Sequence, residues 1–229
     1  MQSPSRMPKA EGGKDSPSKN IGDDIAARSE TAYFVFGRFN PPHKGHKEMV
    51  NILIEKAAAA GADPYVFATS TQNDKRDPLY VHEKVEILKR MYPRVSDVRI
   101  INTTKSACKT IPAVIGRLKD AGYKRIVLVA GGARIADFTG KFEVERGVPL
   151  EVVSGGERDP DAEDPERAGT AAGYSASKMR AAVKGQDWAT FRAGLNETIG
   201  ARSAERLMEK ISTRLKGGTR RRRSKTRKN

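Results

Sequence analysis

The sequence has little of what secreted and membrane proteins require. Among its 229 residues there is one cysteine, Cys108, which excludes a disulfide framework within the chain and fits a reducing compartment. No stretch approaches the roughly 18 consecutive apolar residues of a membrane-spanning helix. The first 20 residues, MQSPSRMPKAEGGKDSPSKN, contain no apolar segment and do not resemble a secretory signal. These absences favour a cytoplasmic protein.

Acidic side chains are scarce relative to basic ones. The sequence has 28 acidic and 43 basic residues and a formal charge of +15. Eight of the basic residues lie in the tail 216–229, KGGTRRRRSKTRKN, which contains no acid and which we predict to be disordered. Such tails contact nucleic acid or another polyanion, act as nuclear localisation signals, or only solubilise the chain. The tail leaves a nuclear or virion location open, but it contains no aromatic side chain on which a base could stack.

The rest of the chain alternates between two kinds of apolar pattern. Residues 1–30 are rich in Ser, Lys, Gly, Pro and Asp and are predicted to be disordered. From residue 31, short apolar runs alternate with segments of helical periodicity, which predicts an α/β fold: a Rossmann-like parallel five-stranded sheet with helices on both faces, flanked by disordered termini. We expect one domain over 31–195, a C-terminal helix over 196–215, and then the tail. The predicted strands are 31–36, 63–70, 97–103, 124–132 and 148–154, and the predicted helices are 44–60, 80–92, 112–122, 175–185, 187–195 and 201–215, with a further helix starting near residue 134.

The loop after the first strand carries the strongest chemical signal. In parallel sheets, ligands bind beyond the carboxyl ends of the strands, and GRFNPPHKGH (37–46) lies at that position. Gly37 allows a sharp turn, and two prolines stiffen the approach to the next helix. His43 and His46 then flank a helix N-terminus, where free N–H groups attract phosphate, and Gly45 between them is expected to leave room for a ligand.

Other interpretations of this loop are weaker. Zinc usually takes three or four protein ligands, whereas only one further histidine and one distant cysteine are available. The pair could be incidental surface histidines, but its position directly after a strand argues against that. A Walker-type phosphate loop, G-x-x-x-x-G-K-[ST], is absent.

The motif G-x-F-N-P-P-H-x-G-H resembles the signature of the HxGH nucleotidylyltransferase superfamily, which includes nicotinamide mononucleotide (NMN) adenylyltransferases, phosphopantetheine adenylyltransferase and glycerol-3-phosphate cytidylyltransferase. Members of that cytidylyltransferase-like group carry a second motif, I-S-x-T-x-x-R, at the start of a helix after the fifth strand. YSASKMR (174–180) occupies this place, with Tyr174 for the isoleucine and Ser177 for the threonine. The resemblance covers roughly residues 31–195.

The second motif has a physical basis of its own. Ser175 and Ser177 lie at a predicted helix N-terminus, where hydroxyl and N–H groups can hold phosphate, and Arg180 follows one turn later with a charged fork. The alternative is an ordinary capped helix, with Ser175 as the N-cap and Arg180 in solvent.

Weaker signals lie in the remaining loops. The resemblance implies that Lys75 and Arg76, after the second strand, reach the acceptor's phosphate, and that the Gly131-Gly132 pair and Arg134, after the fourth, contact the nucleotide. Each could instead be an ordinary solvated or turn residue. The segment SGGERDPDAEDPER (154–167) is similar to segments of uncharacterised nucleotidyltransferase-like proteins of tailed phages and large viruses. This similarity hints at a viral member acting in a host cytoplasm.

The resemblance implies transfer of a nucleoside monophosphate from a nucleoside triphosphate to a phosphorylated acceptor, with release of pyrophosphate. ATP and an NMN-like acceptor are favoured, Mg²⁺ arrives with the triphosphate, and no protein metal ligand is expected. The alternatives are a CTP-dependent enzyme acting on a phosphorylated alcohol, and a non-catalytic nucleic-acid-associated or virion protein. The implied catalytic residues are His43, His46 and Arg180; the implied nucleotide-binding residues are Gly37, Arg38, Phe39, Asn40, Lys47, Gly131, Gly132, Arg134, Tyr174, Ser175 and Ser177; the implied acceptor-binding residues are Lys75 and Arg76.

Overall fold

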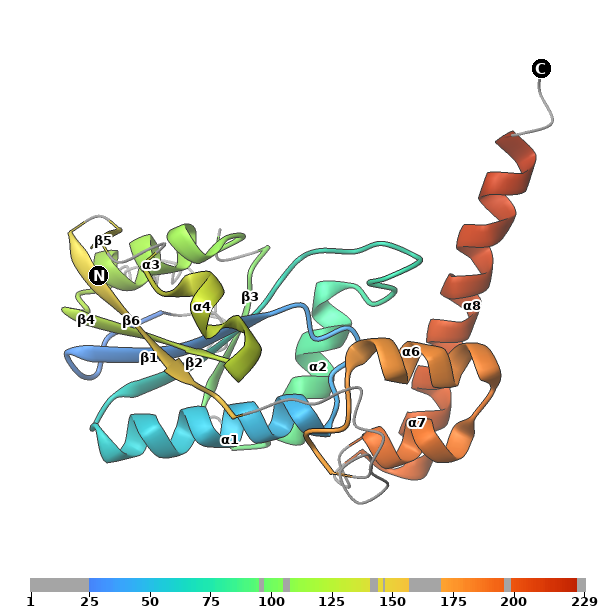
Figure 1. Ribbon diagram of the computed structural model, residues 1–229, viewed down its shortest axis with the longest axis horizontal. Coiled ribbons are helices and arrows are strands. Elements are labelled where there is room, and N and C mark those ends of the chain that lie inside the picture. Colours follow the sequence, from blue (N-terminus) through green and yellow to red (C-terminus); the bar gives the residue numbers. More distant parts are fainter. Residues whose placement is uncertain are drawn as a thin grey trace, which may run out of the picture.

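The computed structural model describes residues 25–94, 97–104, 108–140, 144–145, 147–156, 170–195 and 199–225. Within these ranges the chain forms a six-stranded sheet in the order β3-β2-β1-β4-β6-β5 (Figure 1). The first five of these strands are parallel to one another, which confirms the predicted five-stranded parallel sheet. The strands are β1 (Thr31–Gly37), β2 (Asp63–Ala68), β3 (Arg99–Asn102), β4 (Arg125–Ala130), β5 (Val144–Glu145) and β6 (Val148–Ser154).

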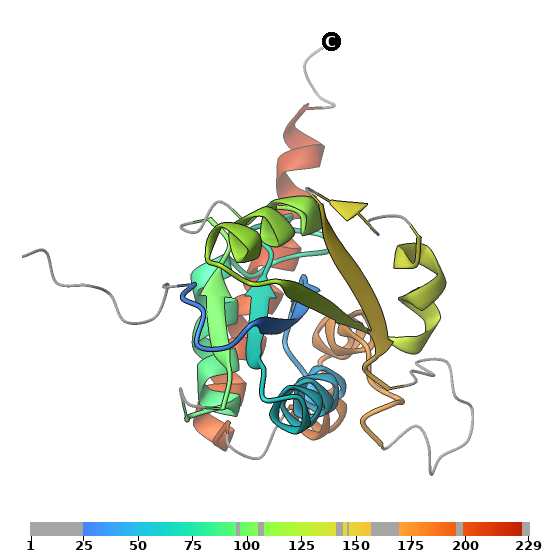
Figure 2. The same cartoon turned by 90° about the vertical axis from the view of Figure 1, so that its left-hand side faces the viewer.

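Helices cover both faces of this sheet, as the alternation of patterns predicts. They are α1 (Lys44–Ala59), α2 (Val81–Met91), α3 (Ile111–Asp120), the short α4 (Ile135–Phe138) after the single turn η1 (Gly132–Arg134), α6 (Ala176–Gly185), α7 (Trp188–Gly194) and α8 (Ala201–Lys225). Figure 2 shows α1 on one side of the sheet and α3 on the other. None of the helices in the described ranges is long and apolar enough to cross a membrane.

Strand β1 explains how two cores arise from one short apolar run. Tyr33 and Val35 face the core formed with α1, α2 and α6 to α8, whereas Ala32 and Phe34 face the core formed with α3. Because side chains alternate along a strand, the buried positions 32–35, AYFV, must all be largely apolar to be buried on both faces. This places β1 at the centre of the sheet and its carboxyl end between the two layers of helices.

The C-terminal helix differs from its prediction. Apolar residues at helical spacing, from Ala204 to Leu215, bury one face of α8, but the helix does not end at residue 215: it continues to Lys225. Arginine and lysine are good helix formers, and cations are favourable near a helix C-terminus, so the basic residues that follow Gly217 and Gly218 support a helix that extends beyond Leu215. Residues 226–229 lie outside the described ranges.

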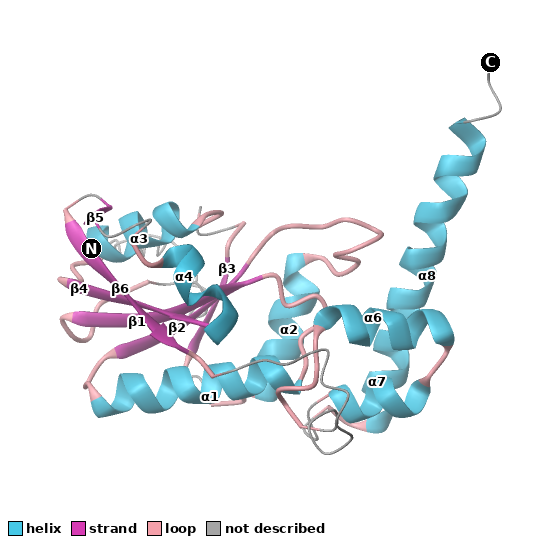
Figure 3. Cartoon of the chain, viewed as in Figure 1, coloured by secondary structure: helices cyan, strands magenta, loops and turns pink. Residues whose placement is uncertain are grey.

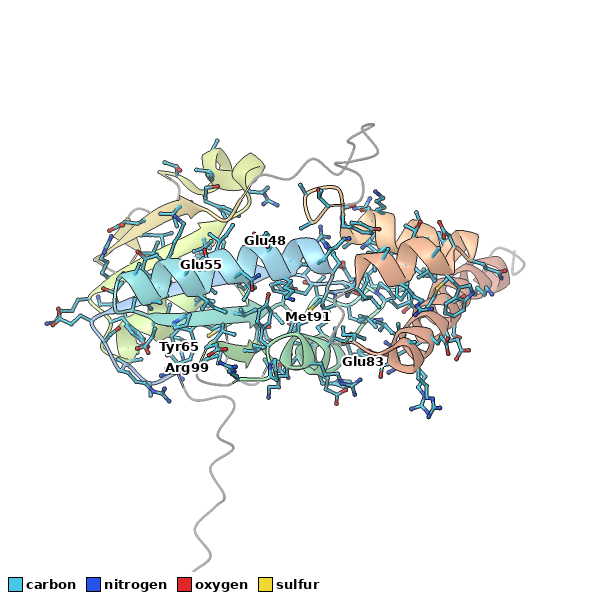
Figure 4. The ribbon with its side chains drawn as sticks, turned by 90° about the horizontal axis from the view of Figure 1, so that it is seen from below. Glu48, Glu55, Tyr65, Glu83, Met91 and Arg99 are labelled. Carbon is cyan, nitrogen blue, oxygen red and sulfur yellow. The ribbon has the colours of Figure 1, made fainter. Side chains whose placement is uncertain are left out.

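The last six residues of the segment predicted to be disordered, 25–30, have a described structure. Residues 25–30 are held at the amino end of the sheet by Asp63, whose Oδ2 accepts hydrogen bonds from the backbone N–H groups of Arg28 (2.8 Å) and Ser29 (3.2 Å). The Tyr123 hydroxyl donates to the same oxygen at 2.7 Å, and Arg99 donates to the Tyr65 hydroxyl beside it (Figure 4). A buried carboxylate with this many donors fixes the chain before β1. Residues 1–24 and most of the acidic segment 154–167 lie outside the described ranges.

Candidate active site

The loop after β1 folds back over its own strand. Phe39 adopts a left-handed backbone conformation, with φ of 46°, and its buried ring lies over Gly37. A Cβ atom on Gly37 would approach the Phe39 ring to 3.0 Å, so any other residue would push this ring from its position. The Phe39 ring also packs against that of His46 at a centroid distance of 4.8 Å. The turn therefore brings the first helix and its histidines under the carboxyl end of β1.

The two histidines form a closely packed, tilted pair at the start of α1. His43 is the N-cap, and its Nδ1 accepts a hydrogen bond from the Gly45 N–H at 3.2 Å. The two imidazole rings lie 3.8 Å apart. His46 lines the cleft described below, whereas His43 is fully buried behind it. Both rings lie on one side of the helix, as the spacing predicts, but only His46 reaches the cleft surface.

Gly45 does not have the role expected from the sequence. A Cβ atom at this position would lie 2.6 Å from the backbone carbonyl oxygen of Ala171. The space beside Gly45 is therefore filled by the segment that leads into α6, and not kept for a ligand. Glycine is needed here because it lets the two motif loops pack directly against each other.

The second motif begins α6 and is joined to the first. The Ser175 hydroxyl caps the helix by accepting from the Lys178 N–H at 3.1 Å. Arg180 donates from Nη1 to the backbone carbonyl of Asn40 at 2.7 Å and from Nη2 to the Ser177 hydroxyl at 3.1 Å. Burial lowers the Arg180 pKa from its usual value. Arg180 is therefore held in place, which excludes the alternative of an arginine extended into solvent.

Asn40 connects this pair of motifs to the loop after β2. Its side-chain Oδ1 accepts from the Leu79 N–H at 2.9 Å, and its Nδ2 donates to the Leu79 carbonyl at 3.1 Å. This two-bond clamp holds the segment that contains Asp77, a carboxylate that is 4% exposed and lies 3.6 Å from Arg38 Nη1. The loop after β1, the loop after β2 and the start of α6, which are distant in sequence, are therefore fixed around the same cleft.

Three residues around this cleft, Asp77, Thr69 and Lys84, are not predicted from the sequence. The fully buried Lys84, on α2, donates from Nζ to the carbonyls of Thr69 (3.0 Å) and Thr71 (2.7 Å). Burial lowers the Lys84 pKa to about 8, with Arg38 adding to the effect and Asp77 opposing it. Asp77 and Thr69 carry a usable signal, since both follow the carboxyl end of a strand. Lys84 carries none, because a lysine in an amphipathic helix is normally solvated.

The enclosed space is a cleft of about 520 Å³ at the carboxyl ends of β1, β2 and β4. Figure 3 shows the loop after β1 passing near the start of α6, and the loop after β2 extending from the same end of the sheet before it turns back to α2. Residues that line the cleft and are not predicted from the sequence include the polar Asp77 and Thr69 and the apolar Ile111, Leu128 and Phe138. The predicted residues that line it are Gly37, Arg38, Phe39, Asn40, His46, Gly131, Arg134, Ser175, Ser177 and Arg180.

The other predicted site residues lie away from the cleft surface. Lys75 and Arg76 are exposed on the turn between Asn73 and Asp77, and Lys47 lines a separate groove beside Arg192.

Two further predicted residues serve the packing around the cleft. Tyr174 is buried, with the ammonium groups of Lys44 and Lys178 4.5 and 4.8 Å from its ring centroid. Gly132 donates its N–H to the Gly156 carbonyl at 3.0 Å.

Arg134 lines the cleft from an exposed position. Its Nε donates to Asp137 at 2.7 Å, and its guanidinium carbon lies 5.0 Å from the Phe138 ring centroid. Both partners lie in the following helix, α4, so the side chain is held mainly by exposed local contacts.

Comparisons with known proteins agree with this architecture. The family model described as cytidylyltransferase-like matches residues 34–182. A solved Plasmodium falciparum nicotinic acid mononucleotide adenylyltransferase, complexed with APC, has a similar fold (12% identity, 79% of this chain and 98% of that chain, TM-score 0.52). The same enzyme complexed with NaAD aligns with a TM-score of 0.46 (12% identity, 75% and 93%), and a putative nicotinate-nucleotide adenylyltransferase from Vibrio parahaemolyticus with 0.49 (14% identity, 79% and 99%). No match is found among curated protein sequences.

Proposed function

This chain belongs to the cytidylyltransferase-like family, and we propose that its cleft transfers a nucleoside monophosphate from a nucleoside triphosphate to a phosphorylated acceptor. An acceptor phosphate oxygen attacks the α-phosphorus, the bond from that phosphorus to the bridging oxygen breaks, and pyrophosphate leaves with the electron pair. The observation that carries the proposal is the Arg180–Asn40 hydrogen bond, at 2.7 Å, which joins the two motifs on one wall of the cleft. Such transfer depends on positioning and charge stabilisation, which a fixed set of donors provides.

His46 is the proposed donor to the α-phosphate. It lies at the cleft surface in the first turn of α1, where the helix N-terminus adds partial positive charge. His43, fully buried, packs against the His46 ring and caps the helix, so we assign it a positioning role. A proton-bearing imidazole nitrogen held by packing stabilises the charge that grows on the phosphate oxygens in the transition state.

The start of α6 is the proposed binding site for the leaving phosphates. Ser175 and Ser177 line the cleft at a helix N-terminus, and Arg180 projects beside them. A guanidinium has five N–H donors, more than the two bonds to Asn40 and Ser177 use. The remaining donors suit pyrophosphate oxygens, because arginine binds phosphate through paired hydrogen bonds.

ATP and an NMN-like acceptor remain the favoured substrates. The apolar cleft wall, with Ile111, Leu128 and Phe138, suits a base, and Arg38 with Asp77 suits the polar end of an acceptor. The G-R-F-N-P-P sequence resembles NMN adenylyltransferases, and the Plasmodium protein of similar fold is named as an adenylyltransferase. CTP with a phosphorylated alcohol is the alternative pair.

A magnesium ion fits this cleft only as a partner of the triphosphate. Asp77 is the one carboxylate among the residues described as lining the cleft, and it lies 3.6 Å from Arg38. No group of three or more potential metal ligands occurs among the described residues. Magnesium in nucleotide sites often takes most of its ligands from phosphate and water, and there it would neutralise charge on the triphosphate.

The test is pyrophosphate release with Mg²⁺, using ATP or CTP against NMN, nicotinate mononucleotide, glycerol-3-phosphate and phosphocholine. We expect release with one pair, and a loss of about 10²-fold or more in turnover for His46→Ala. His82→Ala is the matched control, because His82 is exposed on α2 and does not line the cleft. An active His46→Ala enzyme would contradict the assigned role.

A non-catalytic nucleic-acid-associated or virion protein is the second candidate. It is favoured by the basic residues at the end of α8, which would suit a polyanionic partner. If no substrate pair gives pyrophosphate release and calorimetry detects no nucleotide binding, this candidate is favoured over the enzyme. Deletion of 219–229 separates the two directly, since an enzyme should keep its turnover after the deletion.

A further inference from the structure

A second groove, of about 360 Å³, lies between the α6–α7 turn and α8. Trp188, the only tryptophan of the chain, forms one side of it, and Lys216 forms part of the α8 side. Trp188 is 40% exposed, and the only other exposed large apolar side chain in the described ranges is Tyr80. The groove shares no residue with the candidate active site. An exposed indole beside a cation is therefore a feature that the proposed reaction does not use.

The groove lies where α8 leaves the body of the protein. Among the α8 residues whose burial is described, 201–217, Leu215 is the last that is buried, and the helix continues to Lys225, projecting away from the sheet and the other helices (Figure 1). From Lys216 onward the sequence holds eight basic residues and no acid. The basic run itself has no aromatic side chain, but the fold brings Trp188 to its base.

We propose that this groove and the basic end of α8 bind single-stranded nucleic acid, with a base stacked on the Trp188 indole. Stacking on an aromatic side chain requires bases that are free of a duplex, and the basic run would follow the phosphates. Glu209 is the one acid among the groove residues, so the phosphates should run along the Lys216 side and the base should face Trp188. Ser212 and Gln186, which also line the groove, offer hydrogen bonds to base edges.

The experiment measures binding of a fluorescein-labelled 20-nucleotide oligothymidylate to the full chain by anisotropy, and of the unlabelled oligomer by intrinsic tryptophan fluorescence. Because Trp188 is the only tryptophan, quenching reports contact at this groove. Trp188→Ala should weaken binding about 10-fold, since one stacked base contributes about 1–3 kcal/mol. Trp188→Phe should retain most of the affinity, and Tyr80→Ala, the matched control at the other exposed aromatic, should bind like the parent.

Two comparisons keep the role of Trp188 distinct from simple charge attraction. Heparin, a polyanion without bases, should bind Trp188→Ala and the parent protein with equal affinity. Deletion of 219–229 should weaken the binding of both heparin and the oligomer. Three results would each overturn the proposal. The first is that Trp188→Ala loses as much affinity for heparin as for the oligomer. The others are that the oligomer does not quench the tryptophan fluorescence, or that the corresponding duplex binds more tightly than the single strand. Far-UV circular dichroism of Trp188→Ala, expected to match the parent, checks that the fold is intact.

Discussion

Glu83 is expected to provide a large, pH-dependent part of the stability that docks α8 on the body. It lies on α2 beside the C-terminal helices (Figure 4) and its side chain is only 8% exposed. Arg214 donates to both carboxylate oxygens, at 2.5 and 2.9 Å, and Lys210 Nζ lies 2.9 Å from Oε1. The Tyr80 N–H adds a fourth interaction at 2.9 Å. Both basic partners belong to α8, so this carboxylate joins that helix to α2.

The size of this contribution to folding stability follows from the pKa of Glu83. Burial alone would raise this pKa, but the hydrogen bonds from Arg214, Lys210 and the Tyr80 N–H lower it from 4.5 to about 2. A difference of that size between the unfolded and folded states corresponds to about 3 kcal/mol of folding stability. The folded pKa is the lower one, so this contribution is fully present above pH 4.5 and is lost as the pH falls from 4.5 to 2.

Urea unfolding of the parent and Glu83→Gln, measured between pH 2 and pH 7, tests this reasoning. The variant should be about 3 kcal/mol less stable at pH 7, and the difference should shrink toward zero at about pH 2. Glu151→Gln is the matched control, because Glu151 pairs with Arg125 at an exposed site (45% exposed) and should lose less than about 1 kcal/mol. A difference between parent and Glu83→Gln that stays constant across this pH range would refute the assignment.

Three further predictions concern the cleft. Gly45→Ala should destabilise the fold by about 1–3 kcal/mol in urea unfolding, because its Cβ would lie 2.6 Å from the Ala171 carbonyl oxygen, whereas Gly185→Ala, with nothing within 4 Å, should not. The unfolding free energy should rise between pH 8 and 10.5, because buried Lys84 loses its proton at about pH 8 when folded and only near 10.5 when unfolded; Lys84→Met should lack this rise. If the proposed function holds, Asp77→Asn should raise the acceptor KM by up to about fivefold in steady-state kinetics, since it removes the carboxylate that lies 3.6 Å from the exposed Arg38 guanidinium.

The local pattern of apolar residues is sufficient to predict the parallel sheet and its crossover helices. β1 is predicted because its apolar run is short and continuous, and α1 because its apolar residues recur at helical spacing. β5, with two residues, is too short to leave any periodic signal, and its pairing with β6 depends on a turn. The extension of α8 to Lys225 is not predicted, because this segment has no apolar face and begins with two glycines, although its arginines and lysines are good helix formers.

Residues that act within one motif were predicted more readily than those that act between motifs. His46 and Arg180 belong to recognisable local patterns, and the structure brings both to the cleft. Lys84 and Asp77 matter only because α2 packs below the loop after β2, which no local spacing reveals. The sequence suggests ligand access at Gly45 because the neighbour that fills this space, the Ala171 carbonyl, is far along the chain.

Asn40 shows why the cleft should respond to changes made at some distance from it. Its backbone carbonyl accepts from Arg180, and its side chain holds both backbone groups of Leu79, so the two motifs and the loop after β2 are joined through one residue. Arg214 of α8 donates to the adjacent Pro78 carbonyl at 2.8 Å, on the same segment. Loss of the Glu83–Arg214 pair would therefore free the segment that carries Asp77 as well as the helix. For this reason Glu83→Gln should alter acceptor KM at temperatures where the protein is still fully folded.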